Sequence, residues 1–408
     1  MEHPRRAWLV LVAVTLALLF GSGTTFASMG IPLFAMAEEF HWSQAEAGIG
    51  FLATGVVCAV ASMAPMLLIP RIGGRWTVVV GCLLLAAGFL LAAKASLLPV
   101  FYAAAAIFGL AFALVANASG TYLVANWFGA HAGRMIGIYM MVGALGDAIL
   151  PPVAGALTAS GGGWRLYWAA MAVVAVLVAG LCAAFIREPP GAASPAGDAP
   201  KDRGKDPGWD YKRFVTAPQF FVLVAAMVGT QFVKLVVSAD IVPHFASRGW
   251  SAEYGAQILG LHGLVGAVAT GISGWLTERW EPKLLLAGAL VLETLGMLLL
   301  AFAHSIWMAY LFVPVFGIGW SVTSLAATVL LIRYFGNNSG TAALSMIWML
   351  AGFATAGPSI AGYMADETGS FVAALSLFGV ILVPIAVAAL FMGTSGRTAK
   401  ATLVPLPD

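Results

Sequence analysis

Residues 77–96 read TVVVGCLLLAAGFLLAAKAS, an apolar run with a single charge close to its end. A helix of about 20 mostly apolar residues is long enough to cross the hydrocarbon core of a bilayer. Similar runs fill the 408-residue chain, which is 61% hydrophobic and only 9% charged, with a mean hydropathy of +0.93. Because a water-soluble fold could not bury so much apolar surface, we predict an all-α membrane protein.

Polar breaks divide the chain into twelve predicted transmembrane helices. The first six cover residues 8–37, 45–69, 77–96, 99–126, 134–158 and 164–186, and the second six cover 217–246, 253–277, 283–303, 306–334, 341–365 and 370–393. Residues 187–214 between them are rich in Pro, Ala, Gly and mixed charge, which is typical of a solvated linker. We therefore predict a bundle over 1–186, a cytoplasmic linker over 187–214, a second bundle over 215–393 and a cytoplasmic tail over 394–408.

The two halves of the chain repeat one another. Four short matches share an offset of 207 or 208 residues: Trp42-Ser43 with Trp250-Ser251, Arg71 with Arg279, Trp127-Phe128-Gly129 with Tyr334-Phe335-Gly336, and Pro151-x-x-Ala154-Gly155 with Pro358-x-x-Ala361-Gly362. Chance matches would not keep one register, so the second half is predicted to be a structural copy of the first. Parallel six-helix repeats are one architecture of secondary transporters, with the substrate site near the membrane midplane between the halves.

The distribution of Lys and Arg predicts the orientation, because cytoplasmic loops carry an excess of both. With the N-terminus inside, only Lys94, Arg165 and Arg248 fall in outer connections, and Lys234 falls inside a span. The other sixteen positions become cytoplasmic: Arg5, Arg6, Arg71, Arg75, Arg134, Arg187, Lys201, Arg203, Lys205, Lys212, Arg213, Arg279, Lys283, Arg333, Arg397 and Lys400. We predict a multi-pass protein of the cell (inner or plasma) membrane with both termini in the cytoplasm.

Several function classes find no support in the sequence. The basic residues are scattered among apolar runs, so no nucleic-acid partner is expected. The three cysteines, Cys58, Cys82 and Cys182, have no metal-ligand spacing. Without a Walker motif or a catalytic cluster, we expect no metal, no cofactor, no enzymatic activity and no ATP-driven pumping by this chain alone.

The stretch Gly274-Trp-Leu-Thr-Glu-Arg-Trp-Glu-Pro-Lys283 resembles the G-x-L-x-D-R-x-x-x-K/R signature of the major facilitator superfamily, with Glu278 in place of Asp. Its first-half counterpart, residues 66–75, has Pro70 where the acid belongs. The resemblance implies a cytoplasmic charge cluster that gates the two halves, here Arg71, Arg75, Glu278, Arg279 and Lys283. The alternative is that these are ordinary positive-inside loop charges.

Four further stretches are similar to the monocarboxylate and oxalate/formate branch of that superfamily: Asn126-Trp127-Phe128, Pro151-Pro152, Gly163-Trp164-Arg165 and residues 357–370. This resemblance implies a rocker-switch carrier of small carboxylates, often coupled to protons. One position departs from the pattern, since Thr270 stands where the branch has a substrate-binding arginine. If the substrate is an anion, another cation must bind it.

Lys234 is the cation that the sequence offers, because it lies near the middle of the seventh predicted span. An ionisable side chain at that depth costs about 3 kcal/mol by insertion scales and therefore needs a partner or a function. Gln231 precedes Lys234 by three residues and Ser238 follows it by four, which places all three on one helical face. This face is predicted to bind the substrate. The alternative is a structural lysine that pairs with an acid or reaches an interface.

Asp147 lies near the centre of the fifth predicted span, where the resembling family tends to have glycine. A neighbouring lysine favours the ionised form of a buried carboxyl, and burial favours the neutral form, so a substrate could switch such a pair. Our hypothesis is that Asp147 carries the coupled proton or pairs with Lys234 when the site is empty. The alternative is a structural acid that is hydrogen-bonded between helices.

The remaining polar residues inside spans are weaker candidates. His262, Asn117 and Tyr122 could contact the substrate, although such residues also serve as packing contacts between helices. Tyr139 and Trp320 are further aromatics at cavity depth, with the same alternative. Glu293 is a second candidate proton carrier, and Asp240, turned away from the face of Lys234, suggests an outer gate or a helix-end charge.

These observations predict a secondary active transporter of a small, monocarboxylate-like organic anion. It would work by alternating access, as a proton symporter, with the anion, protons and the lipid bilayer as its partners, and as a monomer. The alternative is an exporter of hydrophobic drugs or metabolites that uses the same fold with a broad apolar cavity.

Overall fold

The computed structural model describes residues 4–188, 216–335 and 346–393, and all regular elements in these ranges are helices. The predicted all-α class is therefore confirmed. The first half contains α1 (Pro4–Ser22), the π-helical turn η1 (Gly23–Ala27), α2 (Gly30–Phe40), α3 (Gln44–Ala61), α4 (Ala64–Ala93), α5 (Leu98–Val115), α6 (Asn117–Phe128), η2 (Gly129–His131), α7 (Ala132–Gly143), α8 (Gly146–Ala159) and α9 (Gly163–Phe185). The second half contains α11 (Pro218–Ala246), α12 (Ala252–Arg279), α13 (Pro282–Ala301), α14 (Ile306–Phe335), η3 (Gly352–Ala356), α16 (Gly357–Thr368) and α17 (Val372–Phe391).

Eleven helical segments of the described ranges are long and apolar enough to cross a membrane. The exception among the twelve predicted spans is the eleventh, 341–365, whose first residues lie outside the described part. Its remainder is interrupted, with helical residues 346–351 followed by η3 and then α16. The chain is thus a multi-pass membrane protein whose eleventh span is built from short pieces.

Three other predicted spans are broken, and one predicted loop is a tight kink between two helices. The first span bends at η1, the fourth at Ala116 and the fifth between α7 and α8. The connection that we predicted after the second span, residues 70–76, is a tight kink at one non-helical residue, which joins the two helices that make up α4. That residue is Gly73, whose φ of 84° and ψ of 160° suit glycine because it has no Cβ.

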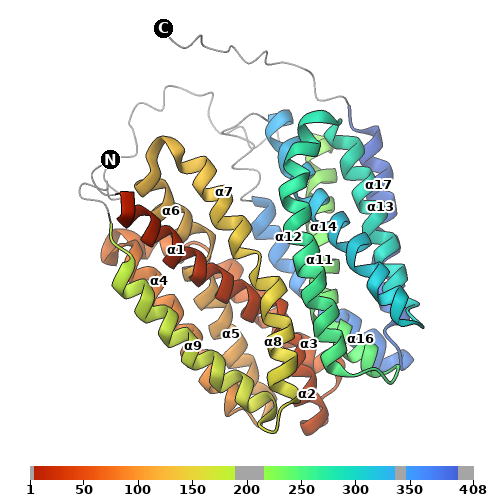
Figure 1. Ribbon diagram of the computed structural model, residues 1–408. Helices are drawn as coiled ribbons and strands as arrows, with labels where there is room; N and C mark the ends of the chain where they lie inside the picture. The colour runs from red at the N-terminus through yellow and green to blue at the C-terminus, as the bar shows by residue number, and fades with distance from the viewer. Residues whose placement is uncertain (1–3, 189–215, 336–345, 394–408) are drawn as a thin grey trace.

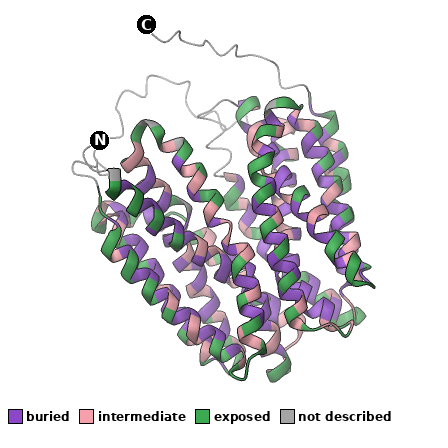
Figure 2. Ribbon diagram, in the orientation of Figure 1, coloured by how far each residue is buried: buried purple, intermediate pink, exposed green. Residues whose placement is uncertain are grey.

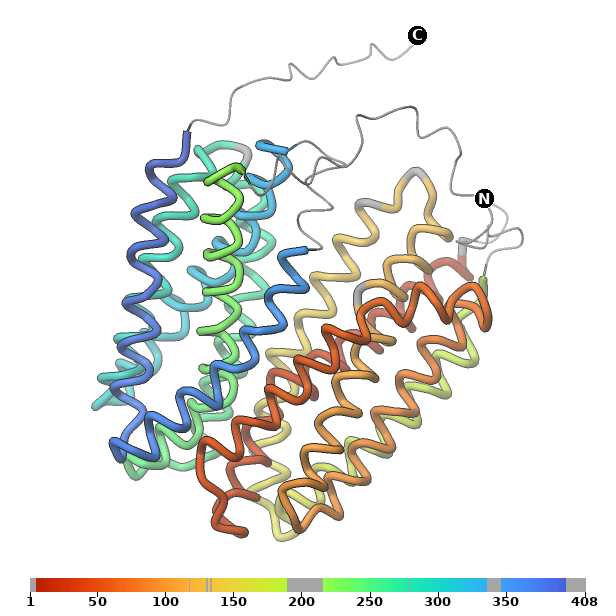
Figure 3. The backbone as a smooth tube through the Cα atoms, turned by 180° about the vertical axis from the view of Figure 1, so that it is seen from behind, coloured from red at the N-terminus to blue at the C-terminus, as the bar shows by residue number. Residues whose placement is uncertain are grey.

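The two halves form two bundles that lie side by side, α1–α9 in one and α11–α17 in the other (Figure 1). We call the face where α1 and α11 begin and α17 ends the terminus face, and the face at the ends of α2, α8 and α16 the far face. The bundles meet near the far face, where α3 packs on α16 and α8 packs on α12. They diverge toward the terminus face (Figures 1 and 3).

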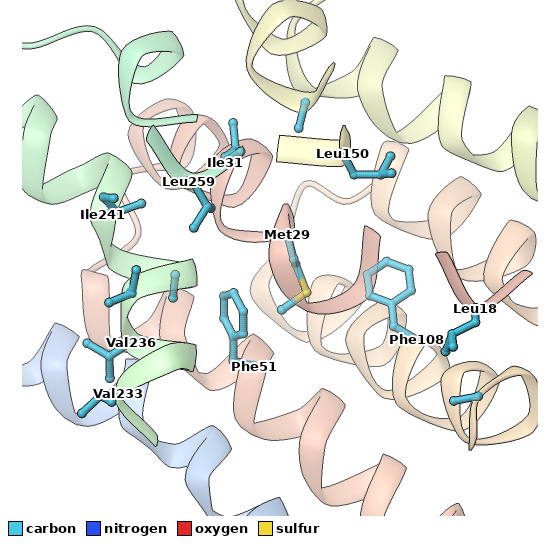
Figure 4. Close-up of a cluster of buried hydrophobic side chains, with 14 of the residues drawn as sticks. Leu18, Met29, Ile31, Phe51, Phe108, Leu150, Val233, Val236, Ile241 and Leu259 are labelled. Atoms are coloured by element: carbon cyan, nitrogen blue, oxygen red, sulfur yellow. The ribbon is translucent and has the colours of Figure 1, made fainter. Parts of the chain in front are cut away.

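Buried residues concentrate inside each bundle and along the contact between the bundles, whereas exposed residues follow the outer helix faces (Figure 2). One apolar cluster is continuous across the contact. Met29 and Phe51 of the first bundle lie in it with Val236 and Ile241 of the second, and all four are at most 1% exposed (Figure 4). Close packing of this kind fixes one arrangement of the halves.

Candidate functional site

An ion pair joins the two bundles at mid-depth. The Nζ of Lys234, on α11, lies 2.8 Å from Oδ2 of Asp147, on α8. At 1.5 Å of rise per residue, Lys234 is about 18 Å from the end of α11 at the far face and about 24 Å from its start at the terminus face. The two side chains are 16% and 12% exposed, so the pair is largely removed from solvent but not sealed.

The first bundle holds Asp147 by two means. Oδ1 of Asp147 accepts a hydrogen bond of 2.9 Å from the hydroxyl of Ser22, and Asp147 lies in the first turn of α8, where the helix dipole favours a negative charge. Ser22 is the last residue of α1 before the π-helical turn, and backbone there touches α8: a methyl group on Gly23 would lie 2.6 Å from the Gly146 carbonyl oxygen. Ser22 was missed by the sequence analysis because nothing marks a serine at a π-turn.

The second bundle holds Lys234 against an aromatic ring. Nζ of Lys234 lies 4.3 Å from the ring centroid of Trp320, on α14, a geometry that favours a cation. The indole Nε1 of Trp320 donates a 3.0 Å hydrogen bond to Oε1 of Gln231. The structure thus brings together Lys234, Gln231 and Asp147 as predicted, and Trp320 contacts both Lys234 and Gln231.

His262 and Ser238 lie near this group but face protein. His262 is 3% exposed and packs among Phe312, Phe316 and Trp320, with ring centroids 6.0, 5.2 and 6.4 Å away, and its Nε2 has no partner among the described residues. Ser238 is also 3% exposed, at the contact of α2 with α11. Neither side chain is open to solvent in this conformation.

Tyr122 and Asn117 are not part of the group that the structure brings together. Tyr122 lies beside Gly74, where a methyl group on that glycine would be 3.1 Å from the Tyr122 ring. Asn117 begins α6 after the break at Ala116, and its side chain lies outside the described part. No described contact links either residue to Lys234, so their substrate roles stay predictions.

Glu293 lies one layer behind the site. It is fully buried on α13, and its Oε2 accepts a 2.6 Å hydrogen bond from the hydroxyl of Thr230, on α11. A methyl group on Gly319, next to Trp320, would lie 2.8 Å from the Glu293 backbone nitrogen. Glu293 is therefore adjacent to the helices that carry the site but does not contact the ion pair, and its part in proton coupling stays a prediction.

The repeated Pro-x-x-Ala-Gly motif closes the far side. A methyl group on Gly155, at the end of the first copy, would lie 2.6 Å from Cβ of Ala256 on α12. Gly362, at the end of the second copy, touches the backbone of Gln44 on α3. Each copy therefore packs its small residues against the first turns of a helix in the opposite bundle, where a larger side chain would not fit.

A cross-bundle helix cap secures one of these two contacts. Oδ1 and Oδ2 of Asp366, on α16, accept hydrogen bonds from the backbone nitrogens of Gln44 and Ala45 at 3.0 and 2.9 Å. Ser43 and Glu46 form a capping box over the same turn, so the free N–H groups at the start of α3 are satisfied. The position 207 residues before Asp366 is Ala159, so the other contact has no such cap.

On the terminus face, the predicted gating charges bond within their own bundles. Arg75 donates to the Ala183 carbonyl, Lys283 donates to the Met392 carbonyl at 3.3 Å, and Arg279 stacks on Trp275. Arg71 is exposed, and the side chain of Glu278 lies outside the described part. Within the described ranges, no hydrogen bond or ion pair of these side chains joins the two bundles.

One acid that the sequence analysis did not name replaces the acid missing at Pro70. The Glu188 carboxylate accepts a hydrogen bond from the backbone nitrogen of Gly74, directly after the bend at Gly73. Glu188 follows α9, more than a hundred residues from Pro70 in sequence, so no local motif reveals it. The first bundle thus has an acid at this bend, supplied by a distant segment.

Comparisons with known proteins agree with this architecture. Residues 13–356 match the family described as the Major Facilitator Superfamily. Over 373 residues the chain is 27% identical to human monocarboxylate transporter 11. This alignment covers 87% of this chain and 76% of the human protein. Two solved structures, a bacterial homolog of the human lysosomal transporter Spinster (inward-facing, occupied) and a D-xylose–proton symporter, align with TM-scores of 0.79 and 0.75 at 17% and 18% identity. The two alignments cover 98% and 95% of this chain, and 99% and 98% of the respective solved chains. At these identities the likeness concerns the fold alone.

Proposed function

The chain belongs to the major facilitator superfamily, and from that premise we propose that it carries a small organic anion together with a proton across the cell membrane. Members of the family are transporters rather than enzymes, and this chain is a multi-pass membrane transporter. The observation that carries the proposal is the Asp147–Lys234 ion pair, which joins the two bundles at mid-depth.

The ion pair explains how anion and proton would be coupled. A buried charge without a partner strongly destabilises the protein. Separation of the bundles at this level would leave both Asp147 and Lys234 charged and unpaired, and is therefore strongly disfavoured. A monocarboxylate can replace Asp147 as the partner of Lys234, and Asp147 can then become neutral by taking a proton. The site gains one negative and one positive charge, so its net charge is unchanged and the step is electroneutral.

The surroundings of Lys234 suit a small anion. Trp320 covers one side of the ammonium group and Gln231 is bonded to the same indole, so a ligand of Nζ would also lie beside an aromatic ring and an amide. The similarity to human monocarboxylate transporter 11 favours the same substrate class. The excess of Lys and Arg at the terminus face favours a cytoplasmic terminus face, so the described conformation would be open to the cytoplasm.

Uptake into proteoliposomes tests this function. We expect saturable uptake of radiolabelled L-lactate or another short monocarboxylate, stimulated by an acidic outside. Lys234→Ala should abolish it, whereas Lys94→Ala, which removes an exposed lysine at the end of α4, should leave it unchanged. Equal uptake by the Lys234→Ala variant would remove Lys234 from the mechanism. Energised efflux of dyes or drugs, without carboxylate uptake, would instead establish the exporter.

A further inference from the structure

A third carboxyl inside the membrane, that of Asp240, has no hydrogen-bond partner in the described part of the chain. Asp240 lies six residues beyond Lys234 on α11, about 9 Å closer to the far face. Its side chain is only 5% exposed, and Oδ2 is fully enclosed without a hydrogen bond. An isolated ionised carboxylate is very costly in such surroundings, which separates Asp240 from the paired Asp147.

Asp240 lines a small void in the contact between the bundles. The void measures about 10 Å³ and is bounded by α2, α3 and α11, with Phe34, Gln44 and Pro243 among its walls. A space of this size holds about one water molecule. It therefore has room for one water, but not for a larger ligand, beside the carboxyl.

The void adjoins a larger pocket at the far face. That pocket has a volume of about 320 Å³ and shares Phe34, Gln44 and Pro243 with the void, while Glu38 and Ser370 lie at its wider part. Solvent from the far face is thus separated from Asp240 by the side chains that the two spaces share. Asp147, by contrast, lies in the close contact between α8 and α12, where a methyl group on Gly263 would clash with the Asp147 carbonyl oxygen.

The charged and titratable groups around Asp240 are few. Glu38 on α2 is the acid of the larger pocket, and the walls contributed by α3 and α16 are uncharged. On α11 itself, Lys234 is bonded to Asp147, and His244, whose Nε2 lies 2.9 Å from the Leu300 carbonyl oxygen, lines neither space. No cation is therefore in place to hold a negative charge on Asp240.

We propose that Asp240 is a second proton-binding site, which exchanges its proton with the far face through this pocket. This proposal rests on the proton coupling of the proposed function, and it specifies where the proton enters the protein. When the far side opens, α2 and α3 move away from α11, the void joins the pocket, and water reaches the carboxyl. When the far side closes, the proton is enclosed and Asp240 stays neutral beside the apolar contact.

Infrared spectroscopy tests the site without any transport assay. In purified protein reconstituted in lipid, Asp240→Asn should remove part of the absorption of protonated carboxyl groups at neutral pH, whereas Asp147→Asn should not. Asp240→Ser provides a second variant in case the asparagine disturbs folding. Identical protonated-carboxyl absorption in the wild type and in both Asp240 variants would overturn the proposal, whatever the protein transports.

Transport then places the site in the cycle. For a monocarboxylate that the wild type takes up, Asp240→Asn should remove most of the dependence on far-face pH, and dependence on pH at the terminus face should persist. Unchanged dependence on far-face pH would contradict the assignment. If the wild type carries no carboxylate, the proposed function fails while the infrared result still decides whether Asp240 holds a proton.

Discussion

The carboxylate of Asp366 accepts a 3.0 Å hydrogen bond from the backbone nitrogen of Gln44, and so a side chain of one bundle caps a helix of the other. The same carboxylate binds the next amide, that of Ala45, at 2.9 Å. A cap of this kind exists only while the far side is closed. Opening that side separates the carboxylate from the amides and leaves both to water.

Removing this cap should shift the protein toward the conformation that is open at the far face. An N-terminal cap stabilises a helix by about 1 kcal/mol, so Asp366→Ala should change the ratio of the two conformations about fivefold. Spin labels on Ser160 and Ser305, both exposed at far-face loops of different bundles, report the change as a larger population at long distance. Asp366→Asn, which keeps one acceptor, should shift less, and identical distance distributions in all three proteins would contradict the role.

Filling the contact between α3 and α16 should have the same effect by sterics. A methyl group on Gly48 would lie 2.5 Å from the backbone nitrogen of Ser359, so Gly48→Ala must push the two helices apart. We expect slower uptake and a larger far-open population with the same spin labels. Gly271→Ala is the matched control, because a methyl group there meets nothing within 4 Å. Wild-type behaviour of Gly48→Ala would show that this contact is not needed for closure.

Glu293 offers a test of whether every buried acid takes part in coupling. Its carboxyl accepts the Thr230 hydroxyl, an acceptor that glutamine retains. The sequence makes Glu293 a second candidate proton carrier, but it does not contact the ion pair, and on this geometry we expect Glu293→Gln to keep the wild-type dependence of uptake on pH. Loss of that dependence would instead assign Glu293 a proton-carrying role. Glu293→Ala should lower the thermal unfolding midpoint, because it leaves a cavity and an unpaired hydroxyl.

Periodicity and depth were enough to predict the scaffold and the ion pair between the two bundles. The sequence repeat indicates that Pro151–Gly155 and Pro358–Gly362 are equivalent segments, and in the structure each packs against the opposite bundle. Lys234 and Asp147 were predicted because a charge at mid-span needs a partner, and each is the partner of the other. These inferences succeed because they need only the position of each residue along its helix, which the sequence gives directly.

The sequence could not predict contacts that depend on how helices bend and turn. The π-helical turn after Ser22 bends a span that looked continuous in the sequence. The kink at Gly73 connects two helices without the longer loop that we predicted. Asp366 resembles a surface acid until α3 is placed beside it, and Tyr122 shares a span with Asn117 yet lies beside Gly74. Lateral packing decides these positions, and a single sequence carries little information about it.

The most direct test of the account is the proton dependence of Asp147→Asn in proteoliposomes. Asparagine still accepts a hydrogen bond from Ser22 but cannot be ionised or take a proton. We predict that this variant exchanges monocarboxylate across the membrane at equilibrium yet no longer accumulates it when a pH gradient is imposed. Accumulation equal to that of the wild type would contradict the assignment of Asp147 and, with it, the coupling that the ion pair is proposed to provide.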